Sequence, residues 1–282
     1  MVIRRVLLDA FGTVFSPSRP VVTQYTEVAR SYGLAVEDDR VKVAFKRAFK
    51  QWLKSHPMYG KHSSPPLAPG DWWRGVIKDT FRFAGVSDEK LDDVCPSLPK
   101  TLIERFWGSQ GYTLHSEFPQ FLDSLETALG LPPPAIVSNT DPALVKIIDN
   151  LGVSREKFGA RGIKLDEVFT TWELEKEKQQ VGFWDDVLNR LNASTHIGGP
   201  LARDEILVVG DELVADYETP RQAGFKSLLL RRASAEGSDH ANPGYVDEID
   251  GRKIDVEAVR DLMEVIDWIK LHNQRGRLAV LA

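Results

Sequence analysis

The sequence predicts an α/β protein with a doubly wound, Rossmann-like parallel sheet as its core and a helical cap domain inserted into that core. Two observations carry this prediction. Short apolar runs, typical of buried parallel strands, alternate with helical patterns along much of the chain. The first run ends at Leu8 and the second begins only at Ala135, a longer separation than one crossover connection needs.

Five apolar runs are expected to form the strands of the sheet. The first, Val2 to Leu8, is aliphatic apart from Arg4 and Arg5 and breaks at Asp9, as a buried strand that ends in a turn should. The other four are Ala135 to Val137, Val168 to Thr171, Ile206 to Val209 and Ser227 to Leu230. Helical patterns lie between them, at Ala143 to Asn150, Phe183 to Leu191 and Tyr217 to Ala223. This alternation favours a doubly wound sheet.

The inserted segment, residues 17–112, consists mainly of helical patterns separated by proline and glycine. We predict that it is a helical cap domain and that residues 1–16 and 113–282 form the α/β core domain. Its aromatic side chains are expected to pack inside the cap. After the last strand, the polar run from Ala233 to Asp250 is expected to be a loop and Asp255 to Leu271 a helix.

The composition argues against nucleic acid as a partner and indicates a reducing compartment. The net charge of -5 provides no basic field, so nucleic acid is not an expected partner. The first apolar run is too short for a signal peptide, no run is long enough to span a membrane, and the single cysteine, Cys95, suits a reducing compartment. We therefore expect an intracellular protein, cytoplasmic or nuclear. A protein partner is compatible with the sequence, although no pattern indicates one.

Polar residues follow four of the predicted strands, where an open α/β sheet places its ligands. Asp9 follows the first strand, Ser138 and Asn139 the second, and Lys176 and Lys178 the third. The fourth is followed by Asp211, with Asp216 five positions later. Each residue type is also common in turns, helix caps or solvated faces. Their coincidence at the same edge is what indicates a site.

Together these residues suit the handling of a phosphate group. The carboxylates of Asp9, Asp211 and Asp216 are ligands of the kind that Mg²⁺ prefers. With Mg²⁺ and a lysine neutralising the phosphoryl oxygens, Asp9 could attack phosphorus and form an aspartyl-phosphate, while Ser138 donates a hydrogen bond to the same group. The expected ligand is a small phosphorylated metabolite.

The same residues resemble the four signatures of the haloacid dehalogenase superfamily. These are the segments Asp9 to Thr13, Ser138-Asn139, Lys178, and Gly210 to Asp216. In the cap, Tyr59-Gly60 and Asp71-Trp72-Trp73 are similar to the haloacid dehalogenase-like hydrolase domain-containing protein 3 group. The superfamily resemblance spans nearly the whole chain and implies a hydrolase with an α/β core and a cap.

The resemblance also implies roles for individual residues. Asp9 would be the nucleophile, and Ser138 and Lys178 would stabilise the phosphate and the nucleophile. Thr13 and Asn139 would join them in binding substrate. The Mg²⁺ ligands would be Asp9, the Phe11 carbonyl, Asp211 and Asp216. Because Gln179-Gln180-Val181 replaces the Pro-Asp-Pro that usually follows the family lysine, Lys176 remains an alternative to Lys178.

Phe11 is the main departure from the family pattern. Phosphatases of the superfamily carry a second aspartate there, which protonates the leaving group and activates water, and phenylalanine can do neither. General acid-base catalysis contributes about 10²- to 10⁴-fold. Three functions therefore compete: a slow Mg²⁺-dependent phosphatase, a ligand- or partner-binding protein with impaired turnover, and a 2-haloacid dehalogenase, in which Asp9 attacks carbon.

Overall fold

The computed structural model describes residues 2–95, 97–194, 199–232, 245–249 and 252–281. The chain divides into two compact units. The first comprises Met1–Ser16, Leu114–Asn139 and Gly152–Ala282, and the second Pro17–Thr113 and Thr140–Leu151. Strands β2 (Phe15–Pro17) and β3 (Tyr112–Leu114) pair with each other where the chain passes between the units.

The first unit is built on a six-stranded sheet in the order β10-β7-β6-β1-β4-β5, and every adjacent pair in it is parallel. The strands are β1 (Arg5–Leu8), β4 (Ala135–Ser138), β5 (Val168–Thr170), β6 (Ile206–Gly210), β7 (Lys226–Leu230) and β10 (Ala258–Val259). The predicted α/β fold with a parallel sheet is confirmed. Strand β1 lies between β4 and β6, so Ser138 at the end of β4 comes near Asp9 and Asp211, which directly follow β1 and β6.

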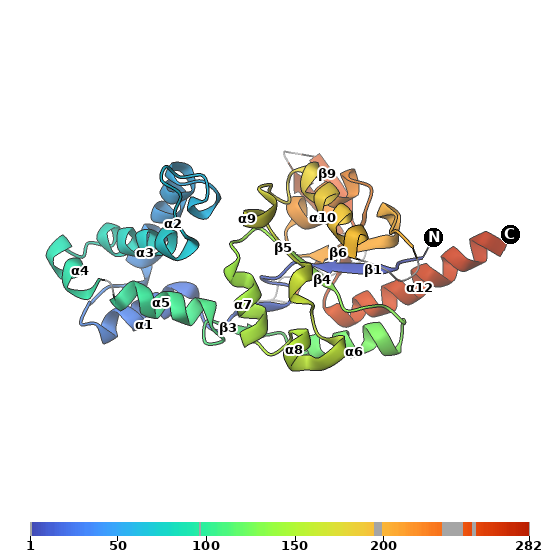
Figure 1. Ribbon diagram of the computed structural model, residues 1–282, viewed down its shortest axis with the longest axis horizontal. Helices are drawn as coiled ribbons and strands as arrows, with labels where there is room; N and C mark the ends of the chain where they lie inside the picture. The colour runs from blue at the N-terminus through green and yellow to red at the C-terminus, as the bar shows by residue number, and fades with distance from the viewer. Residues whose placement is uncertain (1, 96, 195–198, 233–244, 250–251, 282) are drawn as a thin grey trace. The chain divides into compact units, whose positions relative to one another are not determined.

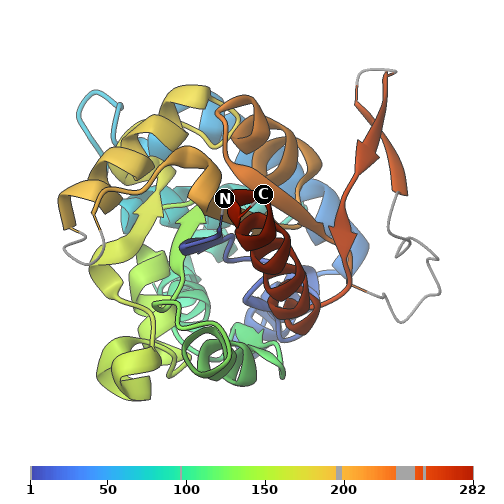
Figure 2. The same ribbon diagram turned by 90° about the vertical axis from the view of Figure 1, so that its right-hand side faces the viewer.

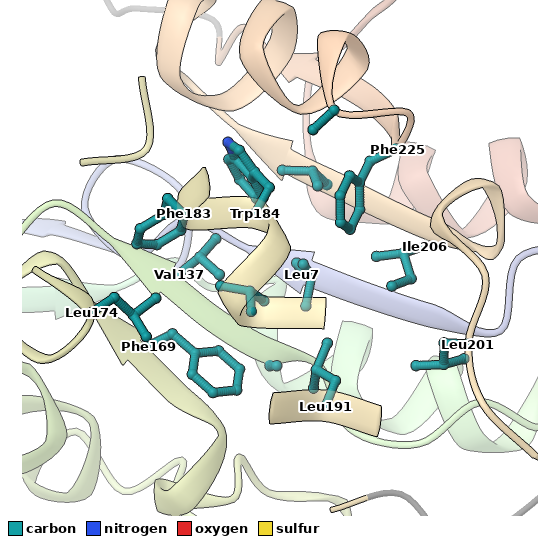
Figure 3. Close-up of a cluster of buried hydrophobic side chains, with 14 residues drawn as sticks. Leu7, Val137, Phe169, Leu174, Phe183, Trp184, Leu191, Leu201, Ile206 and Phe225 are labelled. Atoms are coloured by element: carbon teal, nitrogen blue, oxygen red, sulfur yellow. The ribbon is translucent and has the colours of Figure 1, made fainter. Parts of the chain in front are cut away.

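Helix α10 (Val181–Ser194) covers one face of this sheet because its apolar residues fall on one stripe. Phe183, Trp184, Val187 and Leu191 are all fully buried. They pack against strand side chains such as Leu7, in the cluster drawn in Figure 3. Each fully buried side chain of this size contributes about 1.5–3 kcal/mol, so this contact anchors the strands whose ends carry the site.

The remaining helical elements of the first unit are short, apart from one near the end of the chain. They are α6 (Phe118–Thr127), α8 (Arg155–Phe158), α9 (Thr171–Leu174), α11 (Thr219–Gln222) and α12 (Leu262–Leu281), with 3-10 turns at Gly159–Arg161, Leu165–Glu167 and Arg203–Glu205. A π-helix at Leu213–Glu218 precedes α11, in place of part of the helix expected from Tyr217.

The C-terminal part differs from its prediction in two places. Tyr245–Ile249, expected to be loop, forms strand β8, which pairs antiparallel with β9 (Arg252–Val256); Figure 2 shows this pair standing apart from the sheet. The other residues of the predicted loop, from 233 to 244 and 250, lie outside the described residues. The helix expected from Asp255 begins only at Leu262. Pairing of β10 with β7 outweighs the local helical pattern there.

The second unit is helical. It contains α1 (Val21–Ser31), α2 (Asp38–Ser55), α3 (Pro69–Phe83), α4 (Asp88–Val94), α5 (Ser97–Trp107) and α7 (Ala143–Asn150), with a 3-10 turn at Met58–Gly60 (Figure 1). Trp72 and Phe81 are completely buried in it, as expected for aromatic residues of a helical core. No helix among the described residues is long and apolar enough to cross a membrane.

Candidate functional site: a buried carboxylate and lysine cluster

The polar residues that follow the strands of the first unit meet at one pocket of about 250 Å³. It is lined by Asp9, Phe11, Gly12, Ser138, Asn139, Lys178, Asp211 and Glu212. They meet because β4, β1 and β6 are adjacent and parallel, so their carboxyl ends share one edge of the sheet. Of the predicted site residues, only Thr13 and Asp216 are absent from the lining.

Lys178 is the lysine at this site. Its side chain is 2% exposed, and its Nζ donates to Asp9 Oδ1 at 2.5 Å and to Asp216 Oδ1 at 2.7 Å. Lys176 instead forms a half-exposed ion pair with Asp186 at 2.6 Å. Of the two lysines that the sequence leaves open, only Lys178 reaches Asp9.

The segment around Lys178 is held without the family's usual prolines. The backbone N–H of Lys178 donates to Asn139 Oδ1 at 2.9 Å, and its carbonyl accepts from Trp184 Nε1 at 2.8 Å. Asn139 is fixed in turn, since its Oδ1 also accepts from Thr171 Oγ1 and its Nδ2 donates to Gln179 Oε1, both at 2.8 Å. The Asn139 side-chain contacts therefore position the lysine loop.

Asp216 lies behind the pocket. It is completely buried; its Oδ1 accepts from Lys178 and its Oδ2 from the backbone N–H of Glu212 at 3.0 Å. A side chain at Gly210 would not fit, because an added Cβ would lie 2.3 Å from the Asp216 carboxyl carbon. Asp216 thus stabilises both the lysine and the loop that carries Asp211.

Asp211 reaches the pocket through a close approach to the loop after β1. A Cβ on Gly12 would lie 2.3 Å from Asp211 Oδ2, and Gly12 has a φ of +78°, a conformation that favours glycine. Asp9, Asp211 and Asp216 each offer a carboxylate oxygen, and these atoms lie within 4.8 Å of one another. Such a group of hard oxygen ligands suits a divalent cation.

The charges of the cluster are unbalanced. Burial raises the pKa of the Asp9 carboxyl to about 8; Lys178 opposes this shift and Asp216 adds to it. Burial and the charge of Asp216 also raise the pKa of Asp211, to about 6. Burial acts to lower the pKa of Lys178, but Asp216 and Asp9 outweigh it and raise that pKa. Three carboxylates face one ammonium group, and a divalent cation would supply the missing positive charge.

The side chains of two predicted residues, Thr13 and Phe11, are placed differently with respect to the pocket. Thr13, expected to bind substrate, does not line the pocket. It is completely buried, and its hydroxyl has no hydrogen-bond partner among the described residues. Phe11 does line the pocket, and its ring packs edge-on against Phe15 with the ring centroids 4.9 Å apart. The aromatic ring therefore stands where the family pattern places an acid-base carboxylate.

Sequence reasoning missed several residues that hold the site. Gly12 lies inside the first signature, but its close approach to Asp211 was not predicted. Trp184, which binds Lys178, and Arg231 and Arg232, which bind the loops from the end of β7, lie outside all four signatures. The positive φ of Gly12 could have been suspected from its place in a turn. Arginines and tryptophans at these positions carry no local signal.

Comparisons with known proteins agree with this geometry. A model of haloacid dehalogenase-like hydrolases matches residues 3–224. The chain belongs to the haloacid dehalogenase-like hydrolase family. It is also similar to haloacid dehalogenase-like hydrolase domain-containing protein 3 of Danio rerio, with 30% identity over 83% of this chain and 87% of that protein. The expected superfamily and group are thus confirmed.

Solved structures of haloacid dehalogenase-like proteins share the fold. YfnB from Bacillus subtilis, a HAD-hydrolase bound to magnesium, superposes with a TM-score of 0.60 at 14% identity, covering 96% of this chain and 100% of that one. A 2-haloacid dehalogenase from Pseudomonas syringae gives a TM-score of 0.58 at 15% identity, covering 96% and 99%. At these identities the likeness establishes the fold of this family member and no specific reaction.

Proposed function

We propose that this chain is a Mg²⁺-dependent hydrolase of a small phosphorylated metabolite that acts through an aspartyl-phosphate. One observation carries the proposal: Asp9 shares the pocket with a buried lysine and with a second acid, Asp211, that can hold a divalent cation. A 2-haloacid dehalogenase attacks carbon, which does not require a cation-binding group of carboxylates. The cluster therefore favours phosphorus over carbon as the atom attacked.

In the proposed reaction, an Asp9 carboxylate oxygen attacks the phosphorus atom. Lys178 already binds Oδ1, and Oδ2 accepts no hydrogen bond within the described part of the chain, which leaves it as the attacking atom. A bond forms between Oδ2 and phosphorus as the bond to the leaving oxygen breaks. Water then hydrolyses the aspartyl-phosphate, releasing phosphate and regenerating Asp9. Ser138 and Lys178 would bind the phosphoryl oxygens.

The residues fit a bound Mg²⁺. Asp9, Asp211 and the Phe11 carbonyl would hold it, with Asp216 supporting them from behind the pocket. When bound, the cation neutralises phosphoryl oxygens and lowers the repulsion between Asp9 and an anionic substrate. The magnesium-bound structure of YfnB supports this choice of ion for the shared fold.

The direct test is a screen of purified protein against phosphorylated metabolites, with and without Mg²⁺. The proposal expects phosphate release that depends on Mg²⁺. Phosphate release that is equal in a chelator, or no release from any phosphate ester, would contradict it.

Replacing Asp211 with alanine should weaken Mg²⁺ binding most among the site variants. Asp211 is the proposed ligand with the most accessible carboxylate, whereas Asp216 is occupied by Lys178 and Glu212. Isothermal titration calorimetry with Mg²⁺ would measure the change. The matched control is Asp186→Ala, which removes a surface carboxylate of the same unit. Equal affinity in Asp211→Ala and in the wild type would refute the ligand assignment.

Phe11→Asp should raise phosphatase activity. The new carboxylate would stand in the pocket, two residues from Asp9, where it can protonate the leaving oxygen. We expect at least a tenfold gain in kcat/KM, about 1.4 kcal/mol of transition-state stabilisation, and a larger gain on an alkyl than on an aryl phosphate. Phe11→Asn is the matched control, because it also removes the ring but cannot transfer the proton. Equal rates in the two variants would favour a binding protein with impaired turnover.

A further inference from the structure

We propose that Arg231 and Arg232, the two residues after strand β7, are positioning residues that hold both metal-binding loops of the site. The inference rests on the proposed function and adds to it two residues that lie outside all four sequence signatures. Both side chains bind backbone carbonyls of the loops that follow β1 and β6.

Arg232 holds the loop after β1. Its Nε donates to the Gly12 carbonyl at 3.1 Å and its Nη2 to the Thr13 carbonyl at 2.7 Å. Its Nη1 pairs with Glu117 Oε1 at 2.5 Å, and the arginine side chain is only 23% exposed. These carbonyls directly follow Phe11, whose own carbonyl is the proposed ligand. A planar guanidinium that meets three acceptors at once can fix the path of this turn.

Arg231 holds the loop after β6. Its Nη1 donates to the backbone carbonyl of Asp211 at 2.5 Å. The arginine is well placed because β7 pairs in parallel with β6, with Leu229 opposite Gly210. The two loops also meet directly, where Gly12 approaches the Asp211 carboxylate. The two consecutive arginines therefore hold the loop after β1 and the loop after β6, which carry the proposed metal ligands.

Groups that orient metal ligands affect metal affinity without touching the metal, and their loss typically weakens binding by about 10- to 100-fold. Arg232→Gln should therefore weaken Mg²⁺ binding by about tenfold or more in isothermal titration calorimetry. Arg232→Lys keeps the positive charge but not the planar fork. If geometry is what matters, the lysine variant should recover little of the lost affinity.

A matched control separates positioning from general stability. Arg203 lies in the same unit and also donates both to a backbone carbonyl, that of Ala223 at 2.9 Å, and to a carboxylate, Asp185 Oδ1 at 2.7 Å. Arg203→Gln should lower the thermal unfolding midpoint and leave Mg²⁺ affinity unchanged. If Arg232→Gln does not fold, Glu117→Gln replaces it as the test variant. Glu117→Gln keeps Arg232 but weakens its ion pair, and it should cause a smaller loss of Mg²⁺ affinity.

The outcomes are distinct. Weaker Mg²⁺ binding in Arg232→Gln or Glu117→Gln, with unchanged binding in Arg203→Gln, would support the assignment. Two results would overturn the roles of the arginines but not the proposed function, provided that the wild type binds Mg²⁺. These are an unchanged Mg²⁺ affinity in Arg232→Gln, or an equal loss of Mg²⁺ affinity in Arg203→Gln. A wild-type protein that binds no Mg²⁺ would overturn the proposed function and, with it, this inference.

Discussion

Asp9→Asn should lower phosphatase activity by about a thousandfold or more and should not lower the free energy of unfolding. The loss is expected because an amide cannot form the aspartyl-phosphate, and replacement of a catalytic nucleophile commonly costs this much or more. Stability should hold because the asparagine side chain keeps the shape of the aspartate and can still accept from Lys178. The buried Asp9 carboxylate is also disfavoured, as its raised pKa indicates.

Two measurements check this prediction: initial rates on the best substrate of the metabolite screen, and urea denaturation of the same preparations. Asp186→Asn is the control, since it makes the same chemical change at a half-exposed surface pair. Residual activity close to that of the wild type would point to a contaminating phosphatase or a different nucleophile. A large loss of stability in Asp9→Asn would mean that the activity loss reflects unfolding.

Lys178→Met should give the largest loss of stability among the site variants, about 3–5 kcal/mol. Its ammonium group, with 2% of the side chain exposed, is bound to two buried carboxylates, those of Asp9 and Asp216. Methionine fills similar space but leaves both acids without their positive partner. Breaking a buried ion pair on one side is costly for this reason.

Lys176→Met supplies the comparison. Its ion pair with Asp186 is about 40% exposed on the lysine side, and such surface pairs contribute about 0–1 kcal/mol. Urea denaturation of both variants and the wild type measures the two losses. If the two lysine variants lose the same free energy of unfolding, Lys178 does not neutralise the buried carboxylates of Asp9 and Asp216 as we propose.

The sequence alone predicted five of the six strands of the sheet and the edge at which the candidate site lies. Aliphatic runs that stop at Asp9, Ser138 and Asp211 are local signals, and parallel strands necessarily bring their carboxyl ends to one edge. The boundaries of β1, β4 and β6 depend on residues close in sequence, so they were predictable to within a few positions. The family signatures follow the same local logic, and the family comparison agrees with them.

Only the tertiary structure decided which residues support the site. Lys176 and Lys178 are two positions apart and locally equivalent; burial of Lys178 against Asp9, 169 residues away in sequence, distinguishes them. Arg232 binds the Gly12 carbonyl, 220 residues away in sequence, and the pairing of β10 with β7 moves the start of an expected helix to Leu262. Such contacts depend on where distant segments meet, and the pattern of neighbouring residues does not encode that.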